Sequence, residues 1–212
     1  MKRKLNASLK SLNSFSVEAR AACLLELESG EDLKTFISEF SFDASRDLIL
    51  GGGSNILFAG DVEGTVILNR ITGKRIVEDS SEEVVIEAFA GESWHQLVLW
   101  SLDEGLSGIE NLSLIPGLVG AAPIQNIGAY GVELAEVLDS VLAIDLISGE
   151  TREFDQKECH FAYRNSRFKS ADAGRYLITG IRLRLQRNFK PKLAYKGLGE
   201  ELRSMGIDSP TA

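Results

Sequence analysis

Two glycine-rich segments hold the residues of this 212-residue chain that are best suited to binding a ligand. The longer segment, Ile115–Glu133, contains four glycines, two prolines and the adjacent amides Gln125 and Asn126, and its one charged residue is Glu133. A helix interior loses about 1 kcal/mol for each Gly and about 3 kcal/mol for each Pro, so we expect no core helix here. A solvated loop would carry more charge. We therefore predict a backbone that approaches a ligand closely, with the amides hydrogen-bonded to it, and a cofactor is the natural candidate.

The shorter glycine-rich segment, Gly51–Asn55, directly follows the apolar run Leu48–Leu50. Three glycines allow several backbone N–H groups to point one way, which suits a pyrophosphate, and Ser54 and Asn55 add side-chain donors. The segment has neither the dinucleotide-fold fingerprint nor a Walker loop, and a plain hairpin turn is the alternative. Together with Ile115–Glu133, whose own alternative is a tight crossing of loops in the core, it fits a large two-ended ligand between two lobes.

A third segment, Phe161–Lys169, mixes aromatic rings with the three cations Arg164, Arg167 and Lys169. An arginine offers a planar two-pronged donor to a carboxylate or a phosphate. The alternative is a solvated face with core aromatic residues between the charges.

Histidines and cysteines do not form a recognisable catalytic set. His95, next to Trp94, is one step off the apolar face of its helix, which favours a packing role. Spacing typical of a metal site, of Ser-His-Asp or of Cys-His is lacking, and no metal is predicted. Cys23 and Cys159 are far apart, which favours two reduced thiols over one disulfide. We expect three hairpin carboxylates to be surface charge: Asp145, Glu150 and Asp155.

The elements that must position these residues follow from hydrophobic periodicity. Helices are predicted over residues 31–40 and 94–104, the second with Ser93 as N-cap. Strands are predicted over residues 48–50, 65–69, 75–78, 84–90, 137–147, 151–154 and 175–186. This is an α+β fold with a smaller lobe over residues 1–70, a larger lobe over residues 71–190 and a glycine-broken tail over residues 191–212.

The amino-acid composition limits the kinds of partner that the protein can bind. Hydrophobic residues make up 44% of the chain, enough for a core, and the net charge is −8, which argues against nucleic acid. No apolar run approaches the ~20 residues that span a bilayer, and the basic N-terminus lacks the apolar stretch of a signal peptide. We expect a soluble, cytoplasmic protein with no membrane partner; its oligomeric state is left open.

The motifs, in this order, resemble the UDP-N-acetylenolpyruvoylglucosamine reductases, within the flavoproteins of the vanillyl-alcohol-oxidase (PCMH) type. The matching residues are Asn13–Phe15, Gly51–Asn55, Gly91–His95, Asn111, Ile115–Glu133, Tyr163–Arg164 and Phe168–Lys169. The resemblance implies a two-lobed FAD-binding domain that holds the pyrophosphate at Gly51–Asn55 and the flavin ring nearer Ile124, Gln125 and Gly128. The cofactor-binding residues it implies are Gly51, Gly52, Gly53, Ser54, Asn55, Ile115, Pro116, Gly117, Gly120, Ala121, Ile124, Gln125, Gly128 and Ile178.

The resemblance also implies a reaction. NADPH reduces the flavin, which then passes hydride to the enolpyruvyl double bond of a UDP-sugar to give UDP-N-acetylmuramate, a precursor of peptidoglycan. A cation near the substrate carboxylate would stabilise the enolate-like transition state. By the motif match this catalytic residue is Arg164, with Tyr163 and Tyr195 as substrate-binding residues.

One departure from the family pattern bears on activity. The serine that donates the proton in the family lies in a Gly-Asn-Ala-Gly-Ser-Phe-type motif, which does not occur here, and Ser204 and Ser209 have other surroundings. We therefore expect a chain that lacks the third, substrate-binding domain, binds FAD and does not complete the reaction alone. The alternatives are an FAD oxidoreductase of the same fold with another substrate, and a binding module without catalysis.

Overall fold

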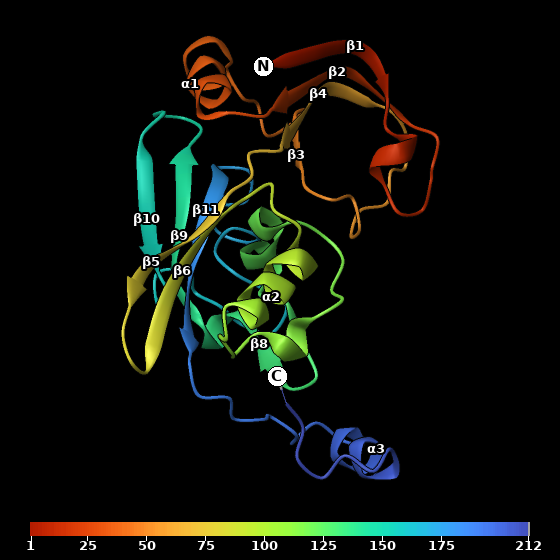
Figure 1. Cartoon of the computed structure of the whole chain (residues 1–212). Coiled ribbons are helices and arrows are strands. Elements are labelled where there is room, and N and C mark those ends of the chain that lie inside the picture. Colours follow the sequence, from red (N-terminus) through yellow and green to blue (C-terminus); the bar gives the residue numbers. More distant parts are fainter. Residues whose placement is uncertain (212) are drawn as a thin grey trace.

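The computed structural model describes residues 1–211 and contains two larger β-sheets, with the N-terminal sheet set across one end of the other (Figure 1). Ala212, the last residue of the predicted tail, lies outside the described residues. The first sheet has the order β1-β2-β4-β3, and the second has the order β10-β9-β11-β6-β5. A two-stranded ribbon of β7 (Gly128–Ala129) and β8 (Val132–Glu133) completes the sheets.

The first sheet ends where the shorter glycine-rich segment begins. Its strands are β1 (Lys2–Ser8), β2 (Arg20–Leu27), β3 (Leu48–Leu50) and β4 (Val62–Asn69). β3 runs parallel to β4, so its carboxyl end delivers Gly51 to the sheet edge. Helix α1 (Gly30–Glu39) connects β2 to the segment before β3; its first turn is capped because the Ser29 hydroxyl accepts the N–H of Asp32, and its Phe36 is buried.

The second sheet is antiparallel throughout and carries the main core. In β11, apolar residues alternate with Arg182 and Arg184, as predicted, so one face is buried and the other meets solvent. Its strands are β5 (Lys74–Asp79), β6 (Glu83–Phe89), β9 (Leu138–Asp145), β10 (Thr151–Asp155) and β11 (Tyr176–Gln186).

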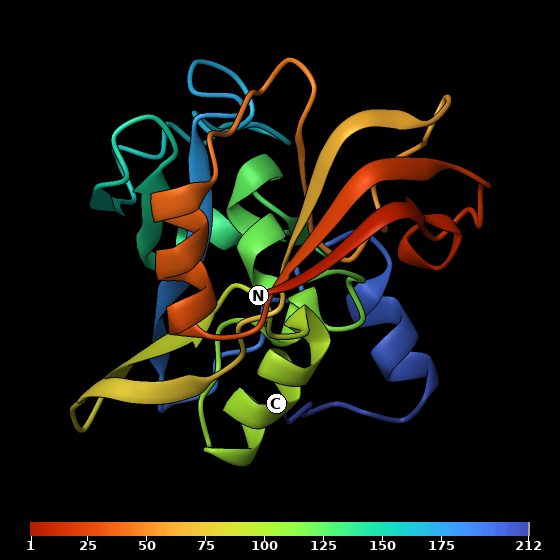
Figure 2. The same ribbon diagram turned by 90° about the horizontal axis from the view of Figure 1, so that it is seen from above.

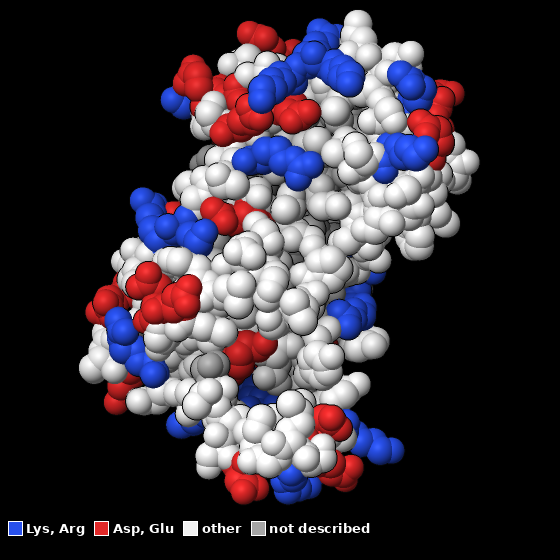
Figure 3. All heavy atoms as spheres, turned by 45° about the vertical axis from the view of Figure 1, so that its right-hand side comes forward, with Lys and Arg blue, Asp and Glu red and all other residues white. Residues whose placement is uncertain are grey.

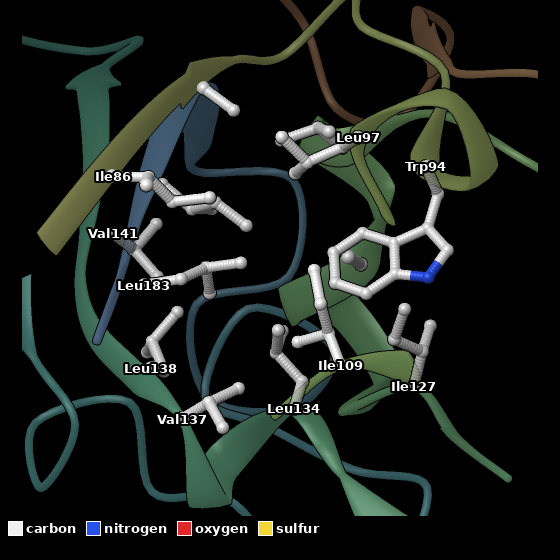
Figure 4. Packing of buried hydrophobic residues seen from close by; sticks show 14 of the residues in the cluster. Ile86, Trp94, Leu97, Ile109, Ile127, Leu134, Val137, Leu138, Val141 and Leu183 are labelled. Atoms are coloured by element: carbon white, nitrogen blue, oxygen red, sulfur yellow. The ribbon is translucent and has the colours of Figure 1, made fainter. Parts of the chain in front are cut away.

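Helix α2 (Trp94–Asp103) covers the buried face of the second sheet. Figure 4 shows Trp94 and Leu97 pointing toward side chains of the strands, among them Ile86, Val141 and Leu183. Trp94 is almost fully buried, and its indole N–H donates to the Leu112 carbonyl at 2.9 Å, which satisfies its polar atom. Through this hydrogen bond the helix holds Leu112, which lies just before the long glycine-rich segment that begins at Ile115.

The two sheets meet through buried contacts at the end of β4. The Asn69 amide donates to the Ile178 carbonyl of β11 at 3.2 Å and accepts the Ile71 N–H at 3.1 Å. Leu177, also on β11, is buried among residues of the first sheet and α1, including Leu27 and Phe36. The view from above shows α1 beside the second sheet (Figure 2).

The predicted α+β class is confirmed, and each predicted helix and strand is present with small shifts of its ends. The predicted strand over residues 137–147 ends at Asp145, because a turn follows that Asp145 itself holds. Two strands of the first sheet were not predicted: β1, which is charged and mostly exposed, and β2. β1 exists because β2 supplies its hydrogen-bonding partners, which no pattern within β1 reveals.

Ser93 occupies the N-cap position of α2, as predicted, but its side chain makes no capping hydrogen bond, and its backbone forms a bridge with Leu118. One local prediction was wrong. Residues Val119–Gln125 form a short 3-10 helix that contains Pro123, where we expected no core helix. The penalties for Gly and Pro apply to the interior of an α-helix, whereas a 3-10 segment forms i→i+3 bonds, so the composition did not exclude it.

The tail contains a short helix, α3 (Leu198–Ser204), at the far end of the molecule from β1 (Figure 1). Charges of both signs are interspersed over the face in Figure 3. Among the helices described, none combines the length and the apolar character that crossing a membrane requires.

The hydrogen bonds of Asn69, where the two sheets meet, lead to a testable prediction. Asn69→Asp replaces the amide donor by a carboxylate oxygen facing the Ile178 carbonyl, so we expect it to lower the free energy of unfolding by about 2 kcal/mol near neutral pH. Urea denaturation measures this. The introduced carboxyl group can donate again once it is protonated, so the loss relative to the unsubstituted protein shrinks at about pH 4, and an equal loss at both pH values would contradict the explanation.

Candidate functional site

A cleft lies between the two sheets and consists of three adjoining cavities of about 310, 330 and 210 Å³. The first cavity is mainly apolar and takes its walls from both sheets, with Leu48–Gly51 and Asn69 from the first and Tyr176–Ile178 from the second. Ala121 lines all three cavities, so they lie around one residue and are hereafter called together the cleft. The predicted cofactor-binding residues all line the cleft except Gly128.

The two glycine-rich segments face each other across this cleft. The Ser54 hydroxyl donates to the Pro116 carbonyl at 3.2 Å, and the Asn55 amide donates to the Gln125 side-chain oxygen at 2.8 Å. A Cβ on Gly52 would lie 3.1 Å from the Cα of Gly117, closer than ordinary van der Waals contact. Glycine is therefore needed at position 52 for the two backbones to come this close.

The backbone of Gly52–Asn55 carries donors that lack protein partners. Within residues 1–211, no protein acceptor receives the N–H groups of these four residues. Gly53 has φ +67°, in the left-handed region, and a side chain there would collide with the Leu12 carbonyl. Successive free N–H groups in such a turn form a concave site that favours an anion. The residues present thus fit a pyrophosphate.

The segment Val119–Gln125 is held firmly by the second lobe. Val119 and Gly120 donate their N–H groups to the carbonyls of Glu92 and Ala90, at 2.9 and 3.0 Å. Val119, Ala122 and Pro123 pack into the main core, so the opposite side of the 3-10 helix, with Ala121 and Ile124, is turned to the cleft. The core thereby orients the wall of the ligand site.

The amide of Asn126 does not serve a ligand, contrary to the prediction. Asn126 is buried with left-handed φ; its amide donates to the Glu133 carboxylate at 2.7 Å and to the Ala162 carbonyl at 3.3 Å, and its oxygen accepts the Ala135 N–H at 3.0 Å. It joins three pieces of chain around the site. Gln125 does line the cleft, where it also holds Asn55.

A separate cavity of about 520 Å³, hereafter the tyrosine cavity, gathers the residues predicted to bind substrate. Tyr163, Arg164 and Tyr195 line it together with Gly128 and Tyr130. The Arg164 guanidinium donates to the Gly128 carbonyl at 2.7 Å, which holds its charge beside the end of the long glycine-rich segment. The structure thus brings the predicted cation and both predicted tyrosines to one place.

Tyr130, which lines the tyrosine cavity, was given no role by the sequence reasoning, and Asn111, one of the matching motif residues, supports it. The Tyr130 ring packs edge-to-face on Tyr195 with centroids 5.5 Å apart, and the Asn111 amide donates to the carbonyls of both Tyr130 and Lys192. Tyr130 and Gly131 both have positive φ, as in a type I′ hairpin turn between β7 (Gly128–Ala129) and β8 (Val132–Glu133). The Tyr-Gly pair was the available signal, although Asn or Asp is commoner at the first position.

His95 contacts the turn that precedes the long glycine-rich segment. Nδ1 of His95 lies 3.2 Å from the Ser113 hydroxyl and 3.3 Å from the Leu114 N–H, so it supports the turn before Ile115. Within the described residues, no group of three or more His, Cys, Asp or Glu side chains could hold a metal ion.

One predicted surface charge is buried. Asp145 is almost inaccessible, and it accepts the N–H of Ile147 at 2.9 Å and two donors from Arg175. Burial raises the pKa of Asp145, but these hydrogen bonds and the Arg175 charge outweigh it and leave the pKa below its usual value. The prediction of a solvated carboxylate was wrong because Arg175 is thirty positions away in the sequence.

The two cysteines are free and buried. Burial raises the pKa of the Cys159 thiol to about 12, against a smaller opposing effect of Arg167. A thiol with such a pKa stays protonated at neutral pH and makes a poor nucleophile.

The comparisons with known proteins agree with this geometry. Residues 21–155 match the family described as "FAD binding domain". A UDP-N-acetylenolpyruvoylglucosamine reductase of Azoarcus sp. is 49% identical over 211 residues, which are 98% of this chain and 60% of that protein. A reductase of the same name from Pseudomonas fluorescens is 45% identical over 207 residues, 98% of this chain and 61% of that protein. The chain thus spans about 60% of the length of the curated relatives it matches.

The fold is shared with a solved structure. The crystal structure of UDP-N-acetylenolpyruvylglucosamine reductase from Thermus caldophilus superposes with a TM-score of 0.66 at 26% identity, covering 99% of this chain and 70% of that one. These findings confirm the resemblance predicted from the sequence.

The buried Cys159 leads to a prediction. In a Cys23→Ser variant, we expect the remaining thiol to resist a disulfide reagent such as DTNB at about pH 8 and to react only as fast as the protein unfolds. Because the thiol keeps its proton in the folded state, stability should also decline as pH rises above the unfolded thiol's pKa of about 8.5. The Cys159→Ser variant serves as the control, and prompt labelling of native Cys159 would contradict its burial.

Proposed function

The chain belongs to the FAD-binding domain family, and on this basis we propose that it holds FAD in the cleft between its two sheets. One observation carries the proposal: the N–H groups of Gly52–Asn55 lack protein acceptors within the described part of the chain and line a cavity closed by Ala121, Ile124 and Gln125. The two phosphates of FAD would supply acceptors for these donors. We assign residues 1–70 and 71–190 to the two lobes of the domain and residues 191–212 to the start of a linker.

The remaining cleft residues suit the rest of the cofactor. In this proposal Pro116, Gly117 and Gly120 border the phosphates, and the apolar walls around Leu48–Leu50 and Ile178 exclude water from the bound ligand. Ile115, Ala121, Ile124, Gln125 and Gly128 then follow the cofactor toward its ring. When bound, FAD supplies two-electron reduction chemistry.

We further propose that the chain is the FAD-binding part of a reductase that uses NADPH to convert the enolpyruvyl UDP-sugar to UDP-N-acetylmuramate, in the cytoplasm. Support comes from the relatives' name and from the tyrosine cavity. Arg164, tied to Gly128, would bind the carboxylate of the enolpyruvyl group and stabilise the negative charge that develops on it. Tyr163 and Tyr195 would hold the substrate against this cation. The 212-residue chain is proposed to bind FAD without completing turnover.

The glycine cradle gives the test of cofactor binding. We expect the purified chain to bind FAD, followed by quenching of flavin fluorescence, and Gly52→Ala to raise the dissociation constant ~10-fold, the equivalent of one lost hydrogen bond to a charged group. The added methyl would press on the Gly117 backbone and so displace the N–H groups of the cradle.

Gly60→Ala is the matched control, since a Cβ there meets nothing within 4 Å and affinity should be unchanged. A chain that stays colourless and takes up no FAD would refute the proposed function. Steady NADPH consumption with the enolpyruvyl substrate by the chain alone would refute the proposed lack of turnover.

A further inference from the structure

We propose that Lys169 is the charged partner of the cofactor's pyrophosphate and that it links phosphate binding to the position of Arg164. The inference rests on the proposed function and extends it to a residue outside both glycine-rich segments. The cavity over Gly51–Ile56 is walled by apolar side chains, glycines, Ser54, two amides and Lys169. Lys169 is therefore the one ionisable side chain among the described residues that line it.

The Lys169 ammonium is not neutralised by the protein. Across residues 1–211 it forms no ion pair with a carboxylate, and its one hydrogen bond runs from Nζ to the Arg164 carbonyl at 3.0 Å. An ammonium group has three N–H donors, so two are left for a ligand. Lys169 is solvent-exposed, and an ammonium without a carboxylate partner beside free backbone donors favours an anion at this place.

Other charges in the cleft do not compete with Lys169. Asp47 lines the first cavity, but its two carboxylate oxygens accept the N–H groups of Thr65 at 2.7 Å and Asp43 at 3.0 Å. These bonds hold the carboxylate between the loop at Asp43 and strand β4, and Asp47 does not line the cavity over Gly51–Ile56. The third cavity, between Ser54 and Ile115, has no ionisable lining residue among those described. Among the described residues that line the glycine cradle, positive potential thus comes from the backbone N–H dipoles and Lys169.

The same lysine holds the turn that presents Arg164. Arg164 has left-handed φ of +53°, which costs energy for a residue with a side chain, and its carbonyl accepts the Lys169 ammonium. Between the two, the buried Ser166 donates to the Ile124 carbonyl on the cleft wall at 2.7 Å. A phosphate bound to Lys169 would therefore fix the side chain that supports Arg164, so that cofactor occupancy and substrate-carboxylate binding share one group.

The experiment compares a flavin that has phosphates with one that has none. Dissociation constants of FAD and riboflavin are measured by fluorescence for the unsubstituted chain and for Lys169→Met, Lys169→Arg and Lys157→Met. Lys157 is exposed and away from the cleft, so Lys157→Met matches the change in net charge. Circular dichroism and thermal unfolding establish that each variant is folded.

We expect Lys169→Met to weaken FAD binding ~10-fold or more while riboflavin binding changes little, because only FAD presents the pyrophosphate. Lys169→Arg should recover most of the affinity, and Lys157→Met should behave as the unsubstituted chain. The dependence of FAD affinity on KCl concentration should also be shallower in Lys169→Met, since a screened charge pair has been removed.

Equal weakening of FAD and riboflavin would mean that Lys169 acts only through the Arg164 turn, and unchanged FAD affinity would mean that it has no role; either result overturns the inference. If the unsubstituted chain does not bind FAD, the proposed function fails, and ADP then serves as the probe by calorimetry. ADP binding that depends on Lys169 would uphold the anion site alone, and absence of ADP binding would overturn it.

Discussion

The backbones of Gly52 and Gly117 lie in close contact, and the rest of the site depends on this close approach. The Ser54–Pro116 and Asn55–Gln125 hydrogen bonds hold the two segments at that distance. A side chain on Gly52 would press on the Gly117 backbone, and one on Gly117, where φ is +128°, would press on the Ser54 hydroxyl. The approach also explains why the segments carry so few charges: a charged side chain between them would have to be desolvated without a partner. The cradle therefore leaves its backbone donors free for an anion.

Each segment is held in place by its own lobe. The shorter glycine-rich segment begins at the end of β3, a short parallel strand. The longer segment is hydrogen-bonded to the chain after β6 and packs on the core below α2. Asn69 and Leu177 join the two lobes at the base of the cleft. The cleft is thus a consequence of how the sheets are joined, and the cofactor would bind across the joint, as ligands often do between domains.

Prediction from the sequence succeeded where the signal was local. Glycine runs after an apolar strand, the alternation in β11 and the spacing in α2 each follow from nearest neighbours along the chain, and the family motifs are contiguous. It failed where a partner is remote. Asp145 was predicted to be on the surface because its partner Arg175 is distant in the sequence. Asn126 was assigned to a ligand because its contacts with Glu133 and Ala162 form only when the chain folds. Strand β1 was missed because its pairing with β2 leaves no pattern in the residues of β1.

The sequence alone determined which groups are available for binding: two glycine-rich segments with few charges and one cation-rich segment. The order of these segments also identified the family. Only the tertiary structure decided which of these residues meet. It brought Arg164 to Gly128 and both predicted tyrosines to one cavity, turned Asn126 inward, and left Lys169 unpaired beside the glycine cradle. The physical reason is that composition fixes which groups can bind, whereas packing of distant segments fixes which donors and charges have already found partners within the protein.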